Sequence, residues 1–170
     1  MRTTHFIDRI TRSIGHTVSW CMAIMVASTL LVVLLRYLAG DGSIVLQEAV
    51  LYLHATSFML GIGYALQQDA HVRVDVFYTR RSPAGKAWVN LSGHLFLLVP
   101  VAVTILWTSL PYVAASWRVL EGSPEVGGIP GIFLLKSLLP LTAGLLLLQG
   151  VAESVRSISL LRRGVPVDGR

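Results

Sequence analysis

Four long apolar stretches dominate this chain and restrict what it can fold into. They cover residues 14–35, 44–66, 88–110 and 129–151. Each is long enough to cross a membrane, because about 20 helical residues at roughly 1.5 Å apiece span the ~30 Å hydrocarbon layer. A water-soluble fold would have to bury four such helices within 170 residues, leaving little chain to cover them. The sequence therefore predicts an all-α membrane protein, a single domain over residues 1–170 with four transmembrane helices.

The charged residues indicate how these helices are oriented. The chain is 54% hydrophobic and only 14% charged. Its net charge of +5 could suggest a nucleic-acid partner, but the positions of the cations argue against one. Eleven of the 14 Lys and Arg residues lie before the first stretch (Arg2, Arg9, Arg12), between the second and third (Arg73, Arg80, Arg81, Lys86) and after the fourth (Arg156, Arg162, Arg163, Arg170), and the others are Arg36, Arg118 and Lys136. The positive-inside rule then predicts that both termini and the middle loop are cytoplasmic. The basic charge indicates topology and contact with membrane lipids, not a nucleic-acid partner.

Turn-forming residues and amphipathic segments divide the chain further. Residues 1–13 mix apolar and basic side chains, which is typical of a short amphipathic segment at the membrane surface. Ser82 and Pro83 form a helix-start signal, with serine as the N-cap and proline in the first turn. Residues 111–130 are rich in glycine and proline, and we expect them to form an irregular outer loop.

Two ionisable residues lie inside the predicted spans, and a charge at that depth needs a partner. Glu48 is near the start of the second span, and Lys136 is near the start of the fourth, so both should lie in one layer below the outer surface. We predict a Glu48–Lys136 contact, with Arg36 as the competing partner of the carboxylate. In the alternative, Lys136 extends to the surface and Glu48 contacts another protein. A lone carboxylate makes a poor site for a coupling ion.

Three histidines raise the question of a cofactor or metal. His54 and His94 lie in neighbouring spans but at different depths, which disfavours their binding one haem. His54 shares a heptad stripe with small residues and is expected to form an interhelical hydrogen bond. His71, Arg73 and Asp75 alternate along one short segment, which indicates a solvated or docking turn more than a closed metal site. The sequence has no phosphate loop, catalytic triad or cysteine cluster, so we expect neither an enzyme nor a cofactor.

These residues together resemble a known family. Arg36-Tyr37 closes the first span, Glu48 lies early in the second, Leu60-Gly61 lies late in it, and His71-Val72-Arg73-Val74-Asp75 follows. In these features the chain is similar to the small membrane subunit, or DctQ-type small permease, of tripartite ATP-independent periplasmic (TRAP) transporters. The resemblance covers nearly the whole chain, and its specific part extends from Arg36 to Asp75.

The resemblance implies a division of labour within a bacterial inner-membrane complex. A large membrane subunit would hold the substrate and Na⁺ sites, and a periplasmic binding protein would capture an organic acid. The small subunit would act as a membrane scaffold in this symport. Arg36, Glu48, His54 and Lys136 would then be structural or subunit-interface residues, and His71, Arg73 and Asp75 would hold a cytoplasmic turn. The outer loop would be a candidate contact for the binding protein.

Two other functions fit parts of the sequence. The chain could be an autonomous small transporter that assembles as a homo-oligomer around Glu48, although no repeat relates its two halves. It could also be a haem-bearing or quinone-linked redox subunit, which is the weaker alternative. The TRAP reading is preferred because it explains why so few ionisable groups lie within the spans.

Overall fold

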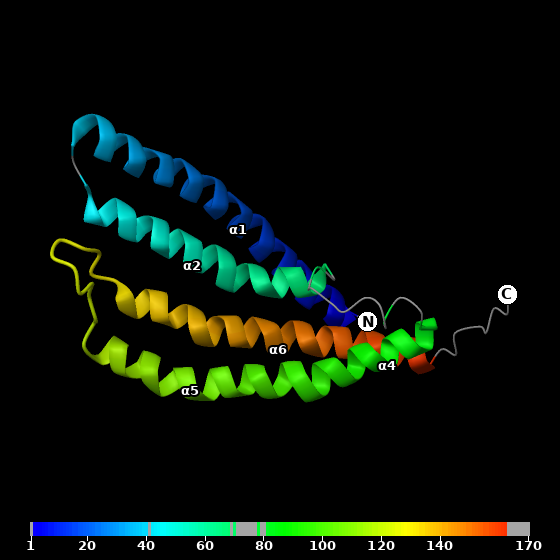
Figure 1. Ribbon diagram of the computed structural model, residues 1–170. Helices are drawn as coiled ribbons and strands as arrows, with labels where there is room; N and C mark the ends of the chain where they lie inside the picture. The colour runs from blue at the N-terminus through cyan, green and yellow to red at the C-terminus, as the bar shows by residue number, and fades with distance from the viewer. Residues whose placement is uncertain (1, 41, 69, 71–77, 79–80, 163–170) are drawn as a thin grey trace.

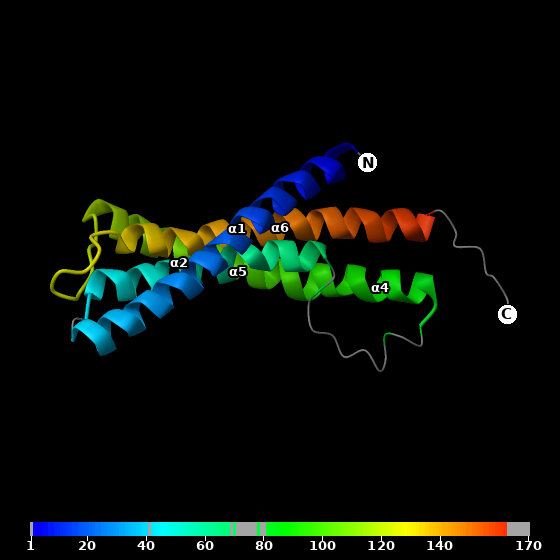
Figure 2. The same cartoon turned by 90° about the horizontal axis from the view of Figure 1, so that it is seen from above.

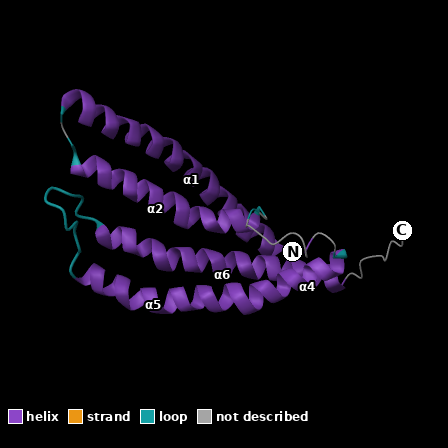
Figure 3. Cartoon of the chain, in the orientation of Figure 1, coloured by secondary structure: helices purple, strands orange, loops and turns teal. Residues whose placement is uncertain are grey.

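A computed structural model describes residues 2–40, 42–68, 70, 78 and 81–162 of the chain. Nearly all of these residues are helical, and none of them forms a β-strand (Figure 3). Four continuous helical segments are long and apolar enough to cross a membrane: Phe6–Ala39, Ile44–Gln67, Pro83–Arg118 and Ile132–Arg162. The all-α prediction with four spans is thus confirmed. The helix of the first span runs without a break from Arg2, so the part of the predicted amphipathic segment that the structure describes is continuous with this span.

The spans are built from five α-helices and two short π-helical segments. Their bounds are α1 Arg2–Leu34, η1 Leu35–Ala39, α2 Ile44–Gln67, α4 Pro83–Gly93, η2 His94–Leu98, α5 Val99–Arg118 and α6 Ile132–Arg162. The helices lie roughly along one direction, and the start of α1 and the end of α6 are at the same end of the bundle (Figure 1). We call this the terminus end. The opposite end, which carries the 119–131 connection, is the loop end.

α2 and α6 form the centre of the bundle. α1 packs against α2 on one side, while α4 and α5 pack against α6 on the other. α1 crosses its neighbours obliquely and meets α6 only toward the terminus end (Figure 2). The buried side chains at the helix contacts are mostly small, among them Ala102, Ala143 and Ala152. Small residues let membrane helices approach closely, and van der Waals packing then holds them together.

The helix ends follow from local sequence. Ser43 caps α2, because its hydroxyl accepts a hydrogen bond from the Leu46 amide at 3.4 Å. Ser82 caps α4 in the same way, accepting from the Gly85 amide at 3.2 Å, which confirms the predicted helix start. Gly40 ends the first span with a φ of 68°, a left-handed conformation that glycine adopts without steric cost. These caps satisfy amides and carbonyls that a helix end would otherwise leave without partners.

The third span contains a π-helical turn that the sequence analysis did not predict. The amide of Val99 donates to the carbonyl of His94, five residues earlier, at the end of η2. Pro100 follows directly, and proline has no amide to donate to the residue four positions before it. A wider turn ahead of a proline accommodates the missing bond, and the helix then continues as α5.

Polar side chains join α1, α2 and α6 at the terminus end. Thr11 of α1 donates to the side-chain oxygen of Gln149, which is 0% exposed, at 3.1 Å. Arg156 of α6 pairs with Asp8 of α1 and with Glu153. Gln67 of α2 donates to the Asp8 carbonyl at 3.0 Å. This network fixes the end of the bundle where α1 and α6 meet.

The predicted outer loop is shorter than expected. α5 continues through Pro111 and ends at Arg118, so the irregular connection covers only residues 119–131. Ser109, Val113 and Ser116, on both sides of the proline, are buried against the bundle. This packing keeps the segment helical despite the hydrogen bond that Pro111 cannot form. α6 likewise remains helical through Pro140.

Candidate functional site

The connection between α5 and α6 has a defined conformation, set first by the end of α5. The Glu121 amide donates to the Ser116 carbonyl at 3.1 Å, and the Leu120 amide donates to the Trp117 carbonyl at 3.3 Å. This pair of bonds is the Schellman arrangement, which places one residue in the left-handed region. Here that residue is Leu120, with a φ of 45°, where glycine is usual. The turn brings the Glu121 side chain back toward the helix it follows.

Glu48 of α2 binds the middle of this connection. One carboxylate oxygen accepts a hydrogen bond from the Ser123 hydroxyl, and the other accepts from the Ile129 amide at 2.5 Å. Ser123 and Ile129 are also joined to each other, the amide of the first donating to the carbonyl of the second at 3.2 Å. The half-buried carboxylate of Glu48 therefore closes a small ring of hydrogen bonds. We call Glu48, Ser123 and Ile129 the loop anchor.

Two glycines let the connection approach Glu48. Gly127 has a φ of 81°, and the Gly128 amide donates to the Glu125 carbonyl at 3.1 Å, which is the pattern of a type II turn. A Cβ atom on Gly128 would lie 2.7 Å from the Glu48 carboxylate and 2.4 Å from the Ser123 hydroxyl. Only glycine fits at this position without displacing the anchor.

Lys136 of α6 binds the start of the same connection. Its ammonium group lies 2.5 Å from the carboxylate of Glu121 and 4.2 Å from the centre of the Tyr112 ring. The Ser116 hydroxyl donates to the same Glu121 oxygen at 2.6 Å. These contacts tie the last turns of α5 to the first turns of α6. Hydrogen bonds from Lys136 and Ser116 hold the pKa of Glu121 below its ordinary value.

Aromatic side chains complete this junction beside the ion pair. The Trp117 indole donates to the Ser137 hydroxyl at 2.8 Å. Its ring meets the Phe133 ring edge to face, with centroids 4.7 Å apart. The helices on both sides of the connection are therefore held by polar and aromatic contacts together.

The predicted Glu48–Lys136 contact is wrong. Lys136 pairs with Glu121 and Glu48 binds the loop anchor, so the two side chains serve different parts of the 119–131 connection. Helical rise predicts only how deep each side chain lies along its helix and does not fix the direction in which the helix presents it. Arg36 is not the partner of Glu48 either. It lies exposed in η1 and forms no ion pair with that carboxylate.

A cleft of about 550 Å³ opens beside the loop anchor. It lies between the start of α2, the turn at Pro124 and Glu125, and the start of α6. Gln47 and Glu48 are its polar lining on α2. Because both Glu48 oxygens accept hydrogen bonds from the chain itself, this carboxylate holds the cleft wall in place.

The other predicted residues lie away from this cluster. His54 is exposed on α2, and its ring stacks on Phe58 at 6.4 Å between centroids. The docking-turn residues His71, Arg73 and Asp75 lie outside the described residues. Within the described ranges, no group of three histidine, cysteine or acidic side chains is placed to hold a metal ion.

Sequence reasoning missed the partners of both charged residues. Ser123 and Glu121 lie within the predicted irregular loop. Serine and acidic side chains beside a glycine commonly form hydrogen bonds with nearby polar groups, which could have indicated their role. The terminus-end network was also missed. Gln149, Glu153 and Arg156 recur at spacings of four and three along α6, which places them on one face of the helix and could have indicated the network.

The comparisons with known proteins give one match. Residues 25–160 match the family model DctQ, described as the DctQ component of tripartite ATP-independent periplasmic transporters. The matched range begins within α1, ends within α6 and includes the whole 119–131 connection. No curated protein and no solved structure matches the chain.

Removing the Glu48 carboxylate should loosen the connection. In Glu48→Ala we expect amide hydrogen exchange across residues 119–131 to accelerate on the order of tenfold or more, because a hydrogen bond to a charged acceptor contributes about 1.5–3 kcal/mol. Hydrogen–deuterium exchange followed by mass spectrometry of the purified chain measures this. Glu125→Ala is the matched control, since the exposed Glu125 lies in the same connection but only its backbone is hydrogen-bonded. Equal exchange in the two variants would refute the role of the anchor.

The Glu121 ion pair should make stability depend on pH. Because its folded-state pKa is lowered, the ionised carboxylate stabilises the fold above the ordinary carboxyl pKa, and this contribution is lost as pH falls through the lowered value. We expect Glu121→Gln to lower the midpoint of thermal unfolding most at neutral pH, with the difference from the unaltered chain closing on acidification. Glu125→Gln should show no such trend. A Glu121→Gln difference that stays constant with pH would contradict the assignment.

Proposed function

The chain belongs to the DctQ family of tripartite ATP-independent periplasmic transporters, and on that premise we propose that it is the small membrane scaffold subunit of such a transporter. It supports Na⁺-driven uptake of an organic acid whose binding and transport sites lie on other chains. A large membrane subunit carries the substrate and Na⁺, and a periplasmic binding protein delivers the acid. The family match covers residues 25–160, a range that includes the resemblance seen between Arg36 and Asp75.

The hydrogen bonds that Glu48 accepts are the main support for this proposal. A carboxylate that binds a coupling ion must offer its oxygens to that ion. Both oxygens of Glu48 accept hydrogen bonds from Ser123 and Ile129 instead, and Lys136 is engaged by Glu121. The charged groups near the loop end therefore fix the conformation of the surface that the 119–131 connection forms. This is the chemistry of a scaffold and is less suited to a transporter that works alone.

The 119–131 connection is the proposed contact for the binding protein. Three exposed apolar side chains lie on it, namely Val119, Leu120 and Val126. Exposed apolar groups on an otherwise anchored loop are typical of a protein interface. The loop anchor and the Lys136–Glu121 pair hold this surface in one conformation, which reduces the entropy that binding would cost.

We place the chain in the bacterial inner membrane with both termini in the cytoplasm. Support comes from the positive-inside rule, because most of the cations lie near the two ends of the chain and in or beside the 68–82 connection. The start of α1 and the end of α6 also lie at one end of the bundle, as an even number of spans requires (Figure 1).

Cysteine labelling tests this orientation. In a Cys21→Ala background, Val126→Cys, at a side chain 93% exposed, should react with a membrane-impermeant maleimide added to intact spheroplasts. Arg81→Cys, exposed at the opposite end, should react only after the membrane is permeabilised. The reverse pattern would overturn the orientation.

Reconstitution tests the division of labour. The tagged chain, purified from its native membrane in mild detergent, should bring down a large membrane subunit that mass spectrometry identifies. Liposomes that hold both subunits, supplied with the binding protein and a Na⁺ gradient, should accumulate one of a panel of labelled dicarboxylates, sialic acids and 2-oxo acids. Liposomes with either subunit alone should not. Accumulation with this chain as the only protein would support an autonomous transporter and refute the scaffold role.

A further inference from the structure

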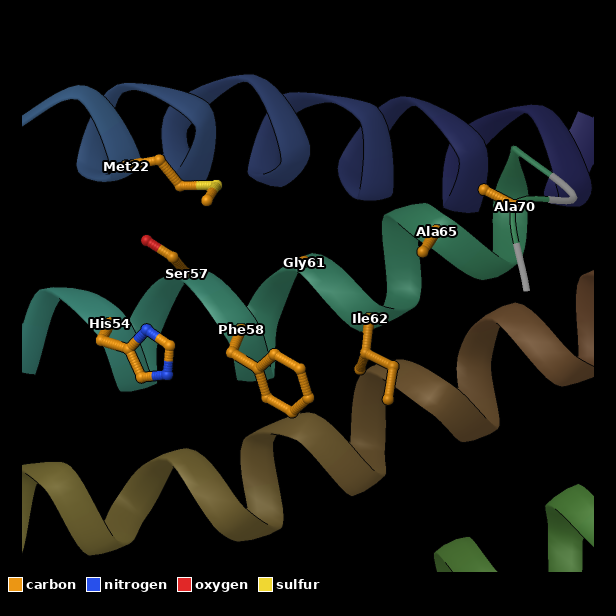
Figure 4. Close-up of a pocket in the computed structure, with 8 residues that line it drawn as sticks. All are labelled: Met22, His54, Ser57, Phe58, Gly61, Ile62, Ala65 and Ala70. Atoms are coloured by element: carbon orange, nitrogen blue, oxygen red, sulfur yellow. The ribbon is translucent and has the colours of Figure 1, made fainter. Parts of the chain in front are cut away.

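A groove of about 550 Å³ opens between α1 and α2, away from the loop anchor. Met22 of α1 forms one wall, and Ser57, Gly61 and Ala65 of α2 lie along the other (Figure 4). The three small residues follow one another at intervals of four, so they form a single ridge on the helix. A Cβ atom on Gly61 would lie 3.7 Å from Val18 of α1, which shows how closely the two helices approach at the closed side of the groove.

Ser57 places an unsatisfied hydroxyl in this groove. The residue is 7% exposed, and its hydroxyl has no hydrogen-bond partner among the residues that the structure describes. Many other hydroxyls in the spans are satisfied within their own helix. Thr29 and Thr142, for example, each donate at 2.7–2.8 Å to the carbonyl four residues earlier. The Ser57 oxygen points instead across the groove toward α1 (Figure 4).

His54 adds a second polar group one turn away. Its imidazole lines the same groove and stacks on Phe58, but it forms no hydrogen bond with any part of the chain that the structure describes. An imidazole has a donor and an acceptor nitrogen, and in hydrocarbon both need partners. Of these two groups, the exposed His54 imidazole has hydrogen-bonding capacity to offer an occupant, whereas the Ser57 hydroxyl at the same level is covered by the chain itself.

The depth of these groups restricts what can satisfy them. α2 begins at Ile44 and ends at Gln67, which makes it about 36 Å long. His54 and Ser57 are about 15 and 20 Å along it, close to its middle. Lipid headgroups do not reach that depth, and an acyl chain has no hydrogen-bonding group. The occupant must carry polar groups to the centre of the membrane, as a protein helix does.

We propose that this groove holds a transmembrane helix of the large membrane subunit, one that presents a hydrogen-bonding side chain at the level of His54 and Ser57. The proposal rests on the proposed function and specifies which face of the chain the large subunit contacts. The small ridge of Ser57, Gly61 and Ala65 allows close approach of the helix backbone. Phe58, 70% exposed beside the ridge, packs against the side of the incoming helix.

Photo-crosslinking of the intact complex tests the contact. A benzoyl-phenylalanine introduced at Phe58 should crosslink to the large subunit when membranes are irradiated before purification. Phe96 is the matched control. It is also a phenylalanine, 72% exposed, but it lies on η2, which packs against α6 on the side away from α1. We expect at least a fivefold higher yield of the crosslinked pair from position 58 than from position 96.

The outcomes separate this inference from the proposed function. If the large subunit is purified with the chain but crosslinks equally or only at position 96, the groove assignment is wrong and the scaffold role stands. A position 58 crosslink to a second copy of this chain, or to lipid alone, likewise overturns the assignment. If no large subunit is purified with the chain, both proposals fail.

Substitution of His54 gives an independent readout. His54→Leu keeps an exposed side chain of similar size but removes both nitrogen atoms, and should lower the recovered ratio of large subunit to tagged chain severalfold. His54→Gln retains a donor and an acceptor and should restore most of that ratio. If leucine and glutamine behave alike, while the tagged chain itself is recovered in normal amounts, the hydrogen-bonding role of the groove is refuted.

Discussion

The hydrogen bonds to the Glu48 carboxylate hold the loop end of this protein together. Glu48 of α2 joins the 119–131 connection through Ser123 and Ile129, which follow it in the sequence by 75 and 81 residues. A carboxylate near the end of a membrane helix is costly unless its charge is met by donors. The connection supplies those donors, and because they are held by the carboxylate, its backbone adopts one conformation. The ion pair between Lys136 and Glu121 holds the start of the same connection against α6.

The two ends of the bundle are therefore polar and fixed, while the middle is held by small apolar contacts. At the terminus end, Gln149 and the Asp8–Arg156–Glu153 group join α1 to α6. Between the ends, residues such as Ala102 and Ala143 let the helices pack closely. The groove beside Ser57 departs from this pattern, because it places polar groups at mid-depth without partners from the described chain. That departure is what distinguishes one face of the bundle from the others.

The sequence predicted the features that depend on local chemistry. Hydropathy gave four helices, and Ser82 with Pro83 gave the start of α4, because both signals act over a few residues. The contacts of Glu48 could not be predicted in the same way, since they depend on a type II turn at Gly127 and on the absence of a Cβ atom at Gly128. Lys136 was assigned to the wrong carboxylate for a related reason. Helical rise fixes how deep a side chain lies but leaves its direction around the helix undetermined until the neighbouring turn is known.

The oblique path of α1 has a consequence for how the protein fits its bilayer. The first span, Phe6–Ala39, has 34 residues and is about 51 Å long, whereas Ile44–Gln67 has 24 residues. A helix that exceeds the hydrocarbon thickness reduces the mismatch by tilting. α1 is joined to α6 only toward the terminus end, so its other end can change inclination with little disturbance to the α2–α6 pair. The slope of α1 is thus one means by which the bundle can match the thickness of its bilayer.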